Sequence, residues 1–139
     1  MIMNRPDHLD ELRQALHELC AKDPLYFRDI LPNDLPERPG VYLITKVEDE
    51  FEIPFWIGRA ENIRSRVHTG LLLGGYSDAS FKLELQEKGI CASVEETKQF
   101  MRERCALRWL RIADARFRDL VSCFAVAVLN PKCGMPREP

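Results

Sequence analysis

The chain has 139 residues and a mass of 16.1 kDa, which is the size of one domain with a substantial core. Hydrophobic residues make up 45% and charged residues 30% of it, so a collagen-like, mucin-like or wholly disordered chain is excluded. The net charge of −2 does not by itself indicate a nucleic-acid-binding protein. The sequence contains no apolar run near the roughly 20 residues that span a bilayer, and its first residues lack the apolar core of a secretory signal. We therefore expect a cytoplasmic protein that does not bind membranes.

The first predicted element is an amphipathic helix from about Asp7 to Cys20, because leucines recur in it every three or four residues. Four prolines then interrupt the chain and predict an extended linker. We expect two parts: an N-terminal helix with a proline-rich linker at 1–34, and a second domain at 35–139. The leucines and prolines are Leu9, Leu12, Leu16, Leu19, Pro24, Pro32, Pro36 and Pro39.

A β-hairpin is predicted next. Gly40 precedes a β-branched and aromatic strand at 41–47, and the acidic run Glu48–Glu50 suits the turn. A second strand follows at 51–57, in which Pro54 indicates an edge or a bulge. We expect Gly58 to end this hairpin.

The rest of the chain alternates between predicted helices and one more strand. Helices are expected from about Glu61 to Thr69, with Gly70 in the following loop, and from Phe81 to Lys88. A capping box at Ser93–Glu96 begins a further helix, and Asp114 caps the last one. These helices extend to about Arg104 and Val128, and the intervening strand is Leu107–Ile112. The order predicts an α+β fold with a small three-stranded antiparallel sheet flanked by helices, plus the extra N-terminal helix.

The cysteines and the distribution of charge limit the cofactors and ligands that we expect the chain to bind. The five cysteines include no Cys-x-x-Cys pair, so we expect reduced thiols, no zinc and no organic cofactor. Seven cations against two acids lie between Lys98 and Arg118. A second basic cluster contains Arg59, Arg64 and Arg66. Such clusters either bind phosphate or are solvated surfaces, and charge alone favours the second interpretation.

Two motifs in the hairpin carry a resemblance to a known family. The first is Pro-Gly-Val-Tyr-Leu-Ile at 39–44, and the second is Trp-Ile-Gly-Arg-Ala-Glu-Asn-Ile-Arg-Ser-Arg-Val at 56–67. Together they resemble the GIY-YIG nuclease family, and within it the catalytic module of the excision-repair nuclease subunit. Arg66 stands eight residues after Gly58, where the family has its catalytic arginine. The ending Leu-Asn-Pro-Lys at 129–132 extends the resemblance from about Leu35 to Gly134.

The resemblance implies a DNA endonuclease that hydrolyses phosphodiester bonds with Mg²⁺ or Mn²⁺. It makes Tyr42 the general base and Arg66 the residue that holds the phosphate, since a guanidinium offers paired donors to phosphate oxygens. The tyrosine pKa of about 10 would have to fall for this role, and nearby cations favour the phenolate. It gives Arg59 and His68 supporting catalytic roles. The expected substrate-binding residues are Trp56, Gly58, Arg64 and Lys46.

Three positions depart from the family pattern. Trp56 replaces the second tyrosine and has no hydroxyl, and no asparagine follows Pro131. Ser122 stands where the family has its metal-binding glutamate, and a serine does not replace a carboxylate as the main anionic ligand. Asp119 lies one turn earlier on the same helix face, with Cβ atoms about 5–6 Å apart, and is the candidate substitute.

Two hypotheses follow for the function. In the first, the chain is a metal-dependent endonuclease, or an inactivated form of one with Ser122 at the metal position. In the second, the same fold is a catalytically silent module that binds nucleic acid or protein. The N-terminal helix is a further candidate for docking a protein partner or a second copy of the chain.

Overall fold

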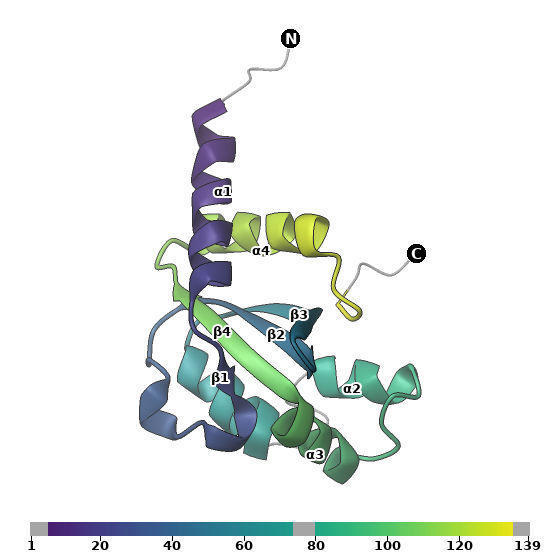
Figure 1. Cartoon of the computed structure of the whole chain (residues 1–139). Helices are drawn as coiled ribbons and strands as arrows, with labels where there is room; N and C mark the ends of the chain where they lie inside the picture. Colours follow the sequence, from purple (N-terminus) through teal and green to yellow (C-terminus); the bar gives the residue numbers. More distant parts are fainter. Residues whose placement is uncertain (1–5, 74–79, 135–139) are drawn as a thin grey trace.

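The computed structural model describes residues 6–73 and 80–134. They form a four-stranded antiparallel sheet in the order β1-β4-β2-β3, with helices on both faces (Figure 1). The predicted α+β class is confirmed, but the sheet has one strand more than predicted. The elements are α1 (Pro6–Ala21), β1 (Leu25–Tyr26), η1 (Phe27–Asp29), η2 (Pro32–Asp34), β2 (Gly40–Glu48), β3 (Phe51–Ala60), η3 (Ser65–Leu73), α2 (Ser80–Glu87), α3 (Val94–Arg104), β4 (Cys105–Arg111) and α4 (Ala115–Leu129).

The predicted hairpin is present as β2 and β3, and a bulge lies between the pairs Ile44–Trp56 and Thr45–Pro54, directly next to Pro54. Contrary to the expectation that Gly58 ends the hairpin, β3 continues to Ala60. The reason is that Gly58 pairs with Tyr42 inside the ladder, and a glycine within a strand often marks a close approach of another group.

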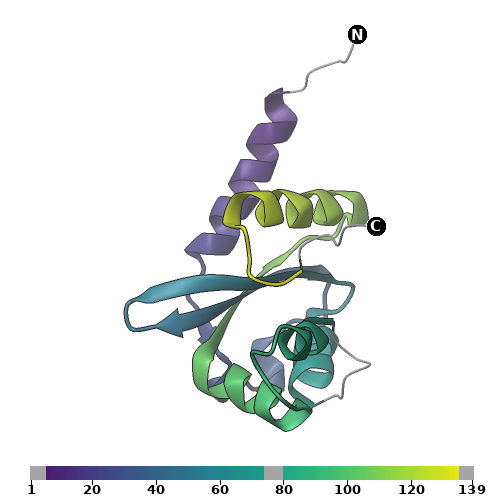
Figure 2. The same ribbon diagram turned by 90° about the vertical axis from the view of Figure 1, so that its right-hand side faces the viewer.

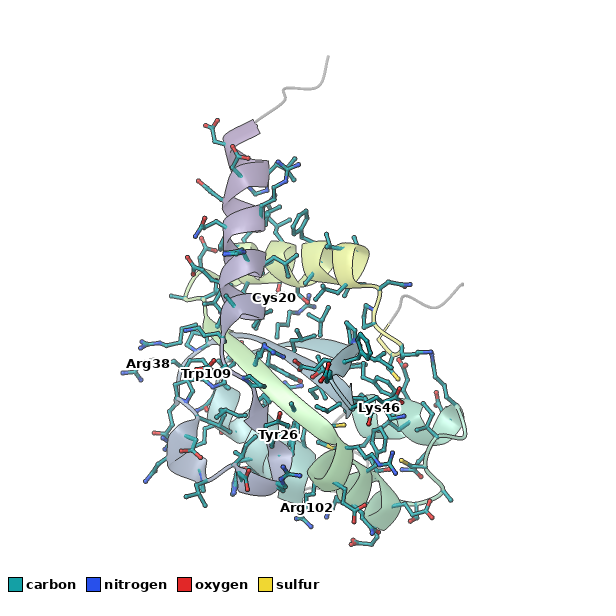
Figure 3. All side chains as sticks on the ribbon, in the orientation of Figure 1. Cys20, Tyr26, Arg38, Lys46, Arg102 and Trp109 are labelled. Atoms are coloured by element: carbon teal, nitrogen blue, oxygen red, sulfur yellow. The ribbon has the colours of Figure 1, made fainter. Side chains whose placement is uncertain are left out.

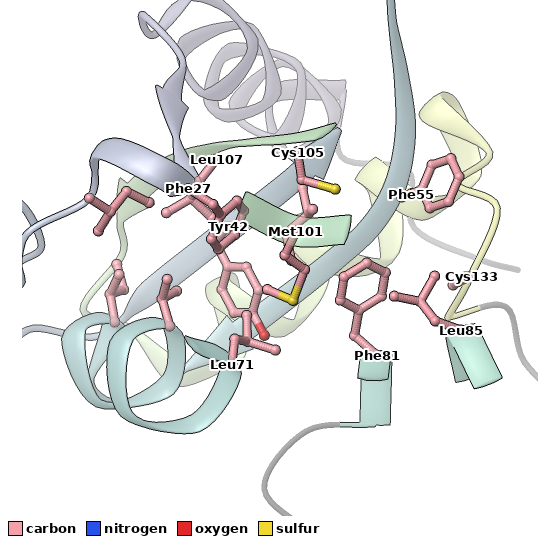
Figure 4. Close-up of a cluster of buried hydrophobic side chains, with 14 of the residues drawn as sticks. Phe27, Tyr42, Phe55, Leu71, Phe81, Leu85, Met101, Cys105, Leu107 and Cys133 are labelled. Atoms are coloured by element: carbon pink, nitrogen blue, oxygen red, sulfur yellow. The ribbon is translucent and has the colours of Figure 1, made fainter. Parts of the chain in front are cut away.

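The two faces of β2 contribute to two separate cores, because successive side chains of a strand point to opposite faces. Tyr42 and Ile44 belong to a cluster with residues of η1, η3, α2 and α3, part of which is drawn in Figure 4. Val41 and Leu43 belong to a second cluster under α1 and α4. Figure 2 shows α1 and α4 on one side of the sheet, with α2 and α3 on the other.

The N-terminal segment is integrated into the rest of the fold. Four apolar residues of α1 are buried in the second cluster together with β2, and β1 pairs with β4. The described residues therefore show no separate packing unit before residue 35. The apolar face of α1, which was a candidate for docking a partner, packs within the chain; the four residues are Leu12, Ala15, Leu16 and Leu19.

The predicted helix at 61–69 is longer than expected. Its main part, η3, is a π-helix that extends to Leu73, so Gly70 lies inside the helix and not in a loop. The Gly70 carbonyl accepts a hydrogen bond of 2.8 Å from Lys82 Nζ, which is buried at the beginning of α2. A buried charge with this partner fixes the end of η3 on α2.

The caps predicted at Ser93 and Asp114 are confirmed, but the Glu96 carboxylate accepts from Ala92 N at 2.6 Å and not from Ser93 N, so the predicted capping box is only half formed. The Ser93 hydroxyl accepts from Glu96 N at 3.1 Å, and the Asp114 carboxylate accepts from two backbone N–H groups at the beginning of α4. The five cysteines are all free, with three of them buried. Among the described residues, no helix has the length and apolarity needed to cross a membrane.

Candidate functional site

A cavity of about 490 Å³ lies between the β2–β3 hairpin, the beginning of η3 and the middle of α4. We call it the tyrosine cavity. It brings together six of the ten predicted site residues, which come from four different elements. Its lining residues are Tyr42, Trp56, Ile57, Gly58, Arg59, Arg66, Ser122, Cys123, Val126 and Gly134.

The position of Tyr42 depends on Gly58. The tyrosine is 3% exposed, and its ring occupies the space above the glycine on the neighbouring strand. A Cβ atom at position 58 would lie 2.5 Å from the ring Cε1 atom, a distance that no side chain tolerates. Glycine has no Cβ and leaves this space to the ring. Tyr42 of the first sequence motif and Gly58 of the second are therefore in direct contact.

The burial of Tyr42 opposes the pKa change that its predicted role as general base requires. Burial raises the pKa of its phenol above the ordinary value, and this outweighs the lowering by the Trp56 N–H and by the charge of Arg66. Tyr42 is therefore a neutral hydroxyl near pH 7 in this structure, and its role as the general base stays a prediction. The Trp56 indole nitrogen is buried without a well-aligned hydrogen bond among the described residues, although it lies close enough to affect Tyr42.

A second depression of about 790 Å³ adjoins the cavity, and Arg59 and Arg66 line both. We call it the arginine cleft. It is further lined by Arg118, whose buried guanidinium donates to the carbonyls of Ile112 and Ala113 at 3.2 and 3.3 Å. The other lining residues are Ala60, Glu61, Asn62, Ser65, Thr69, Gly70, Ala115 and Asp119.

The main ion pair at the junction joins Arg59 Nε to Asp119 Oδ1 over 3.3 Å. Both side chains are a little over half exposed, at 55% and 56%. Arg59 comes from β3 and Asp119 from α4, so the pair connects the sheet to the helix that closes the cavity.

Three predicted site residues line neither the cavity nor the cleft. Arg64 donates from Nε to the Leu35 carbonyl at 2.9 Å and lies 3.5 Å from the Glu37 carboxylate, so it holds the linker against η3. His68 is half-buried on η3. Lys46, labelled in Figure 3, pairs with Glu48 at 2.5 Å near the turn of the hairpin.

The basic run between Lys98 and Arg118 does not form one surface. Arg102, labelled in Figure 3, lies on α3, on the opposite side of the sheet from α4. Arg108 makes a two-pronged ion pair with Glu52 at 2.5 and 2.8 Å. Arg118 is the member of the run that reaches the cleft, so the positive charge at the site comes mainly from the second basic cluster.

The donor set of the tyrosine cavity does not fit a divalent cation. Mg²⁺ and Mn²⁺ prefer carboxylate oxygens, and no Asp or Glu is among the described residues that line the cavity. Ser122 lies there in place of the family glutamate, and the carboxylate of Asp119 is paired with Arg59. The described part of the chain contains no group of three His, Cys, Asp or Glu residues that could hold a metal ion.

Gly134 is a site residue that the sequence analysis missed. Its φ of +81° suits glycine, and an added Cβ would lie 2.9 Å from the Trp56 ring. Its backbone N–H donates to both Glu84 carboxylate oxygens, at 2.9 and 3.0 Å. The segment after α4 thereby covers Trp56, and a single glycine near the C-terminus gave no signal for this.

No protein-family profile matches the sequence, and no curated protein matches it. Solved structures that are similar to the chain include three of the GIY-YIG N-terminal endonuclease domain of UvrC from Thermotoga maritima. Two are tyrosine-to-phenylalanine variants described as bound to the catalytic divalent cation; each has a TM-score of 0.48, is 15–16% identical, and the match covers 91% of this chain and 98% of theirs. The third, bound to magnesium, has a TM-score of 0.41 and 16% identity over 88% of this chain and 94% of its own. The descriptions of these structures name the same family that the two hairpin motifs resemble.

Proposed function

We propose that this protein binds nucleic acid through a phosphate group in the tyrosine cavity, as a GIY-YIG-type site that does not cleave its ligand. One observation carries the proposal. The cavity brings the side chains of Tyr42, Arg59 and Arg66 together around Ser122, and none of its described lining residues is a carboxylate.

These donors suit a phosphate. The guanidinium groups of Arg59 and Arg66 supply two positive charges and planar pairs of N–H donors. The neutral Tyr42 hydroxyl supplies a further donor that needs no counter-ion, whereas the Trp56 N–H is buried beside Tyr42 and not exposed to the cavity. A partly closed site strengthens each of these contacts, because the local dielectric constant is lower than that of water.

The same residues support binding better than hydrolysis. Phosphodiester cleavage needs an activated water as well as neutralisation of the charge that develops on the phosphate. The arginines can supply the second requirement. The first requirement is not met without a metal, because burial raises the pKa of Tyr42 and Ser122 offers no carboxylate to hold a cation.

Nicking of supercoiled plasmid DNA in Mg²⁺ or Mn²⁺ tests the absence of cleavage. The parent chain, Ser122→Glu, Ser122→Gln and the double variant Ser122→Glu/Tyr42→Phe are compared. Of the four proteins, we expect only Ser122→Glu to cleave. Ser122→Gln has a side chain of the same size without the negative charge, and the double variant lacks the Tyr42 hydroxyl. Nicking by the parent chain would contradict the proposal.

DNA binding is measured in the same buffer with EDTA in place of the metal. We expect the parent chain to bind with a strong dependence on salt concentration and Arg66→Gln to bind at least tenfold more weakly, since a hydrogen bond to a charged group contributes about 1.5–3 kcal/mol. No binding at low salt would refute the proposed function.

Metal-dependent endonuclease activity is the second candidate, and one observation favours it. Asp119 lies one turn before Ser122 and its half-exposed carboxylate borders the neighbouring cleft. If it holds a cation there, the parent chain nicks plasmid DNA and Asp119→Asn does not. Nicking by both the parent chain and Asp119→Asn would mean that the metal is bound elsewhere.

A further inference from the structure

We propose that the arginine cleft is a second phosphate subsite on the path of the bound strand, and that Asp119 competes with this phosphate for Arg59. This inference rests on the proposed function. It adds a location for the neighbouring phosphate and a built-in competitor that weakens binding.

The continuity of the two hollows supports a shared strand. Arg59 and Arg66 form the wall between the tyrosine cavity and the arginine cleft, so each guanidinium borders both. A phosphate in the cavity leaves the next one along the strand near the same two side chains. Arg118 adds a third positive charge to the cleft, and its bonds to Ile112 and Ala113 hold it in place.

The beginning of the helix that includes η3 borders the cleft, but its backbone donors are already used. Ser65 N donates to the Asn62 side chain at 3.0 Å, and the N–H groups of Ile63 and Arg64 donate to linker carbonyls at 3.0 Å. The arginine side chains are therefore the ligands on which the second subsite depends.

Asp119 opposes an incoming phosphate. Its carboxylate lies 3.3 Å from Arg59 Nε, and each side chain is more than half exposed. An exposed ion pair of this kind is weak, so a phosphate oxygen can replace the carboxylate. The negative charge of Asp119 nevertheless remains in the cleft and lowers the affinity for the strand.

The cleft is tested with a pair of variants that add the same charge in different places. Thr69 is exposed and lines the cleft but not the cavity. Phe51 is 74% exposed at the turn end of β3, while the cleft lies at the Ala60 end. In EDTA and at low salt, we expect Thr69→Glu to weaken DNA binding roughly three- to tenfold and Phe51→Glu to change it less than twofold. Equal effects of the two variants would overturn the second subsite.

Competition by Asp119 is tested with a double-mutant cycle. We expect Asp119→Asn to bind DNA about two- to fivefold more tightly than the parent chain, in proportion to the strength of an exposed ion pair. In the Arg59→Gln background the same change should have a clearly smaller effect, since the competed group is gone. Unchanged or weaker binding by Asp119→Asn, or an equal gain in both backgrounds, would overturn this role.

These outcomes separate the inference from the proposed function. If Arg66→Gln weakens binding while Thr69→Glu and Asp119→Asn change nothing, the cavity binds phosphate and the cleft does not. If the parent chain fails to bind DNA at low salt, both proposals are refuted.

Discussion

The ring of Tyr42 on β2 lies directly against the backbone of Gly58 on β3, and the two residues are antiparallel partners in the ladder. The contact places the tyrosine hydroxyl at the cavity and buries the ring in the main core. A structural role and a binding role therefore meet in one side chain. The absence of a Cβ at position 58 is what allows both.

Gly58→Ala should destabilise the protein, because the new methyl group has to displace the Tyr42 ring. We expect a loss of about 1–3 kcal/mol in the free energy of unfolding, measured by urea denaturation. The Tyr42→Ala background serves as the control, since it removes the ring that the methyl group meets. An equal cost of Gly58→Ala with and without the ring would show that the contact is not the cause.

We expect substitution of Arg64 to lower mainly the stability of the protein and substitution of Arg66 to lower mainly its DNA binding. Arg64→Gln loses the contacts to Leu35 and Glu37, so we expect a lower free energy of unfolding by about 1 kcal/mol and DNA binding close to that of the parent chain. Arg66→Gln removes an exposed charge at the cavity and should show the reverse. If Arg64→Gln were the variant that loses binding, the assignment of the two arginines would be wrong.

The reactivity of the exposed cysteines measures whether DNA occupies the tyrosine cavity. Cys20 and Cys123 are exposed and the other three thiols are buried, so a thiol reagent should modify two cysteines in the native protein. Cys123 lines the cavity, and bound DNA should therefore slow its modification while Cys20 reacts as before. Mass spectrometry of the labelled peptides provides the readout. Equal protection of both thiols, or of neither, would argue against binding at the cavity.

Alkaline pH should destabilise the fold through its buried thiols. Burial raises the pKa of Cys105 from 9.0 to about 12 and that of Cys133 to about 11. Between these values and 9 the folded protein holds protons that the unfolded chain releases, so stability is full below pH 9 and falls as the pH rises towards 11. Urea denaturation across this range measures the slope. Cys105→Ala should reduce the slope even if it lowers stability at pH 7, and an unchanged slope would contradict the assignment.

The local patterns of the sequence predict most of the framework. Leucine spacing locates α1, and the alternation of Val41–Leu43 with Tyr42–Ile44 anticipates a sheet covered on both faces. The missed strand, β1, has only two residues, which is too short for any periodic signal. Its existence depends on pairing with β4, a long-range contact that no local pattern contains.

The candidate site is harder to predict from local sequence patterns than the fold, because it depends on the directions in which side chains point. Arg64 and Arg66 are two positions apart, yet one holds the linker and the other lines the cavity. Asp119, the candidate metal ligand, pairs with Arg59 and lines the neighbouring cleft, which its position one turn before Ser122 does not reveal. The raised pKa of Tyr42 follows from its burial, which arises from the assembled core and not from its neighbours in the sequence.

Metal-free binding of a fluorescently labelled DNA by the parent chain, Ser122→Glu and Ser122→Gln tests whether a phosphate of the DNA enters the tyrosine cavity. Fluorescence anisotropy in EDTA at low salt gives the dissociation constants. We predict that the parent chain binds, and that Ser122→Glu binds at least about tenfold more weakly than Ser122→Gln, because its carboxylate faces the site of the phosphate beside Arg59 and Arg66. Equal binding by the two variants would contradict the account, since it would mean that the phosphate does not enter the tyrosine cavity.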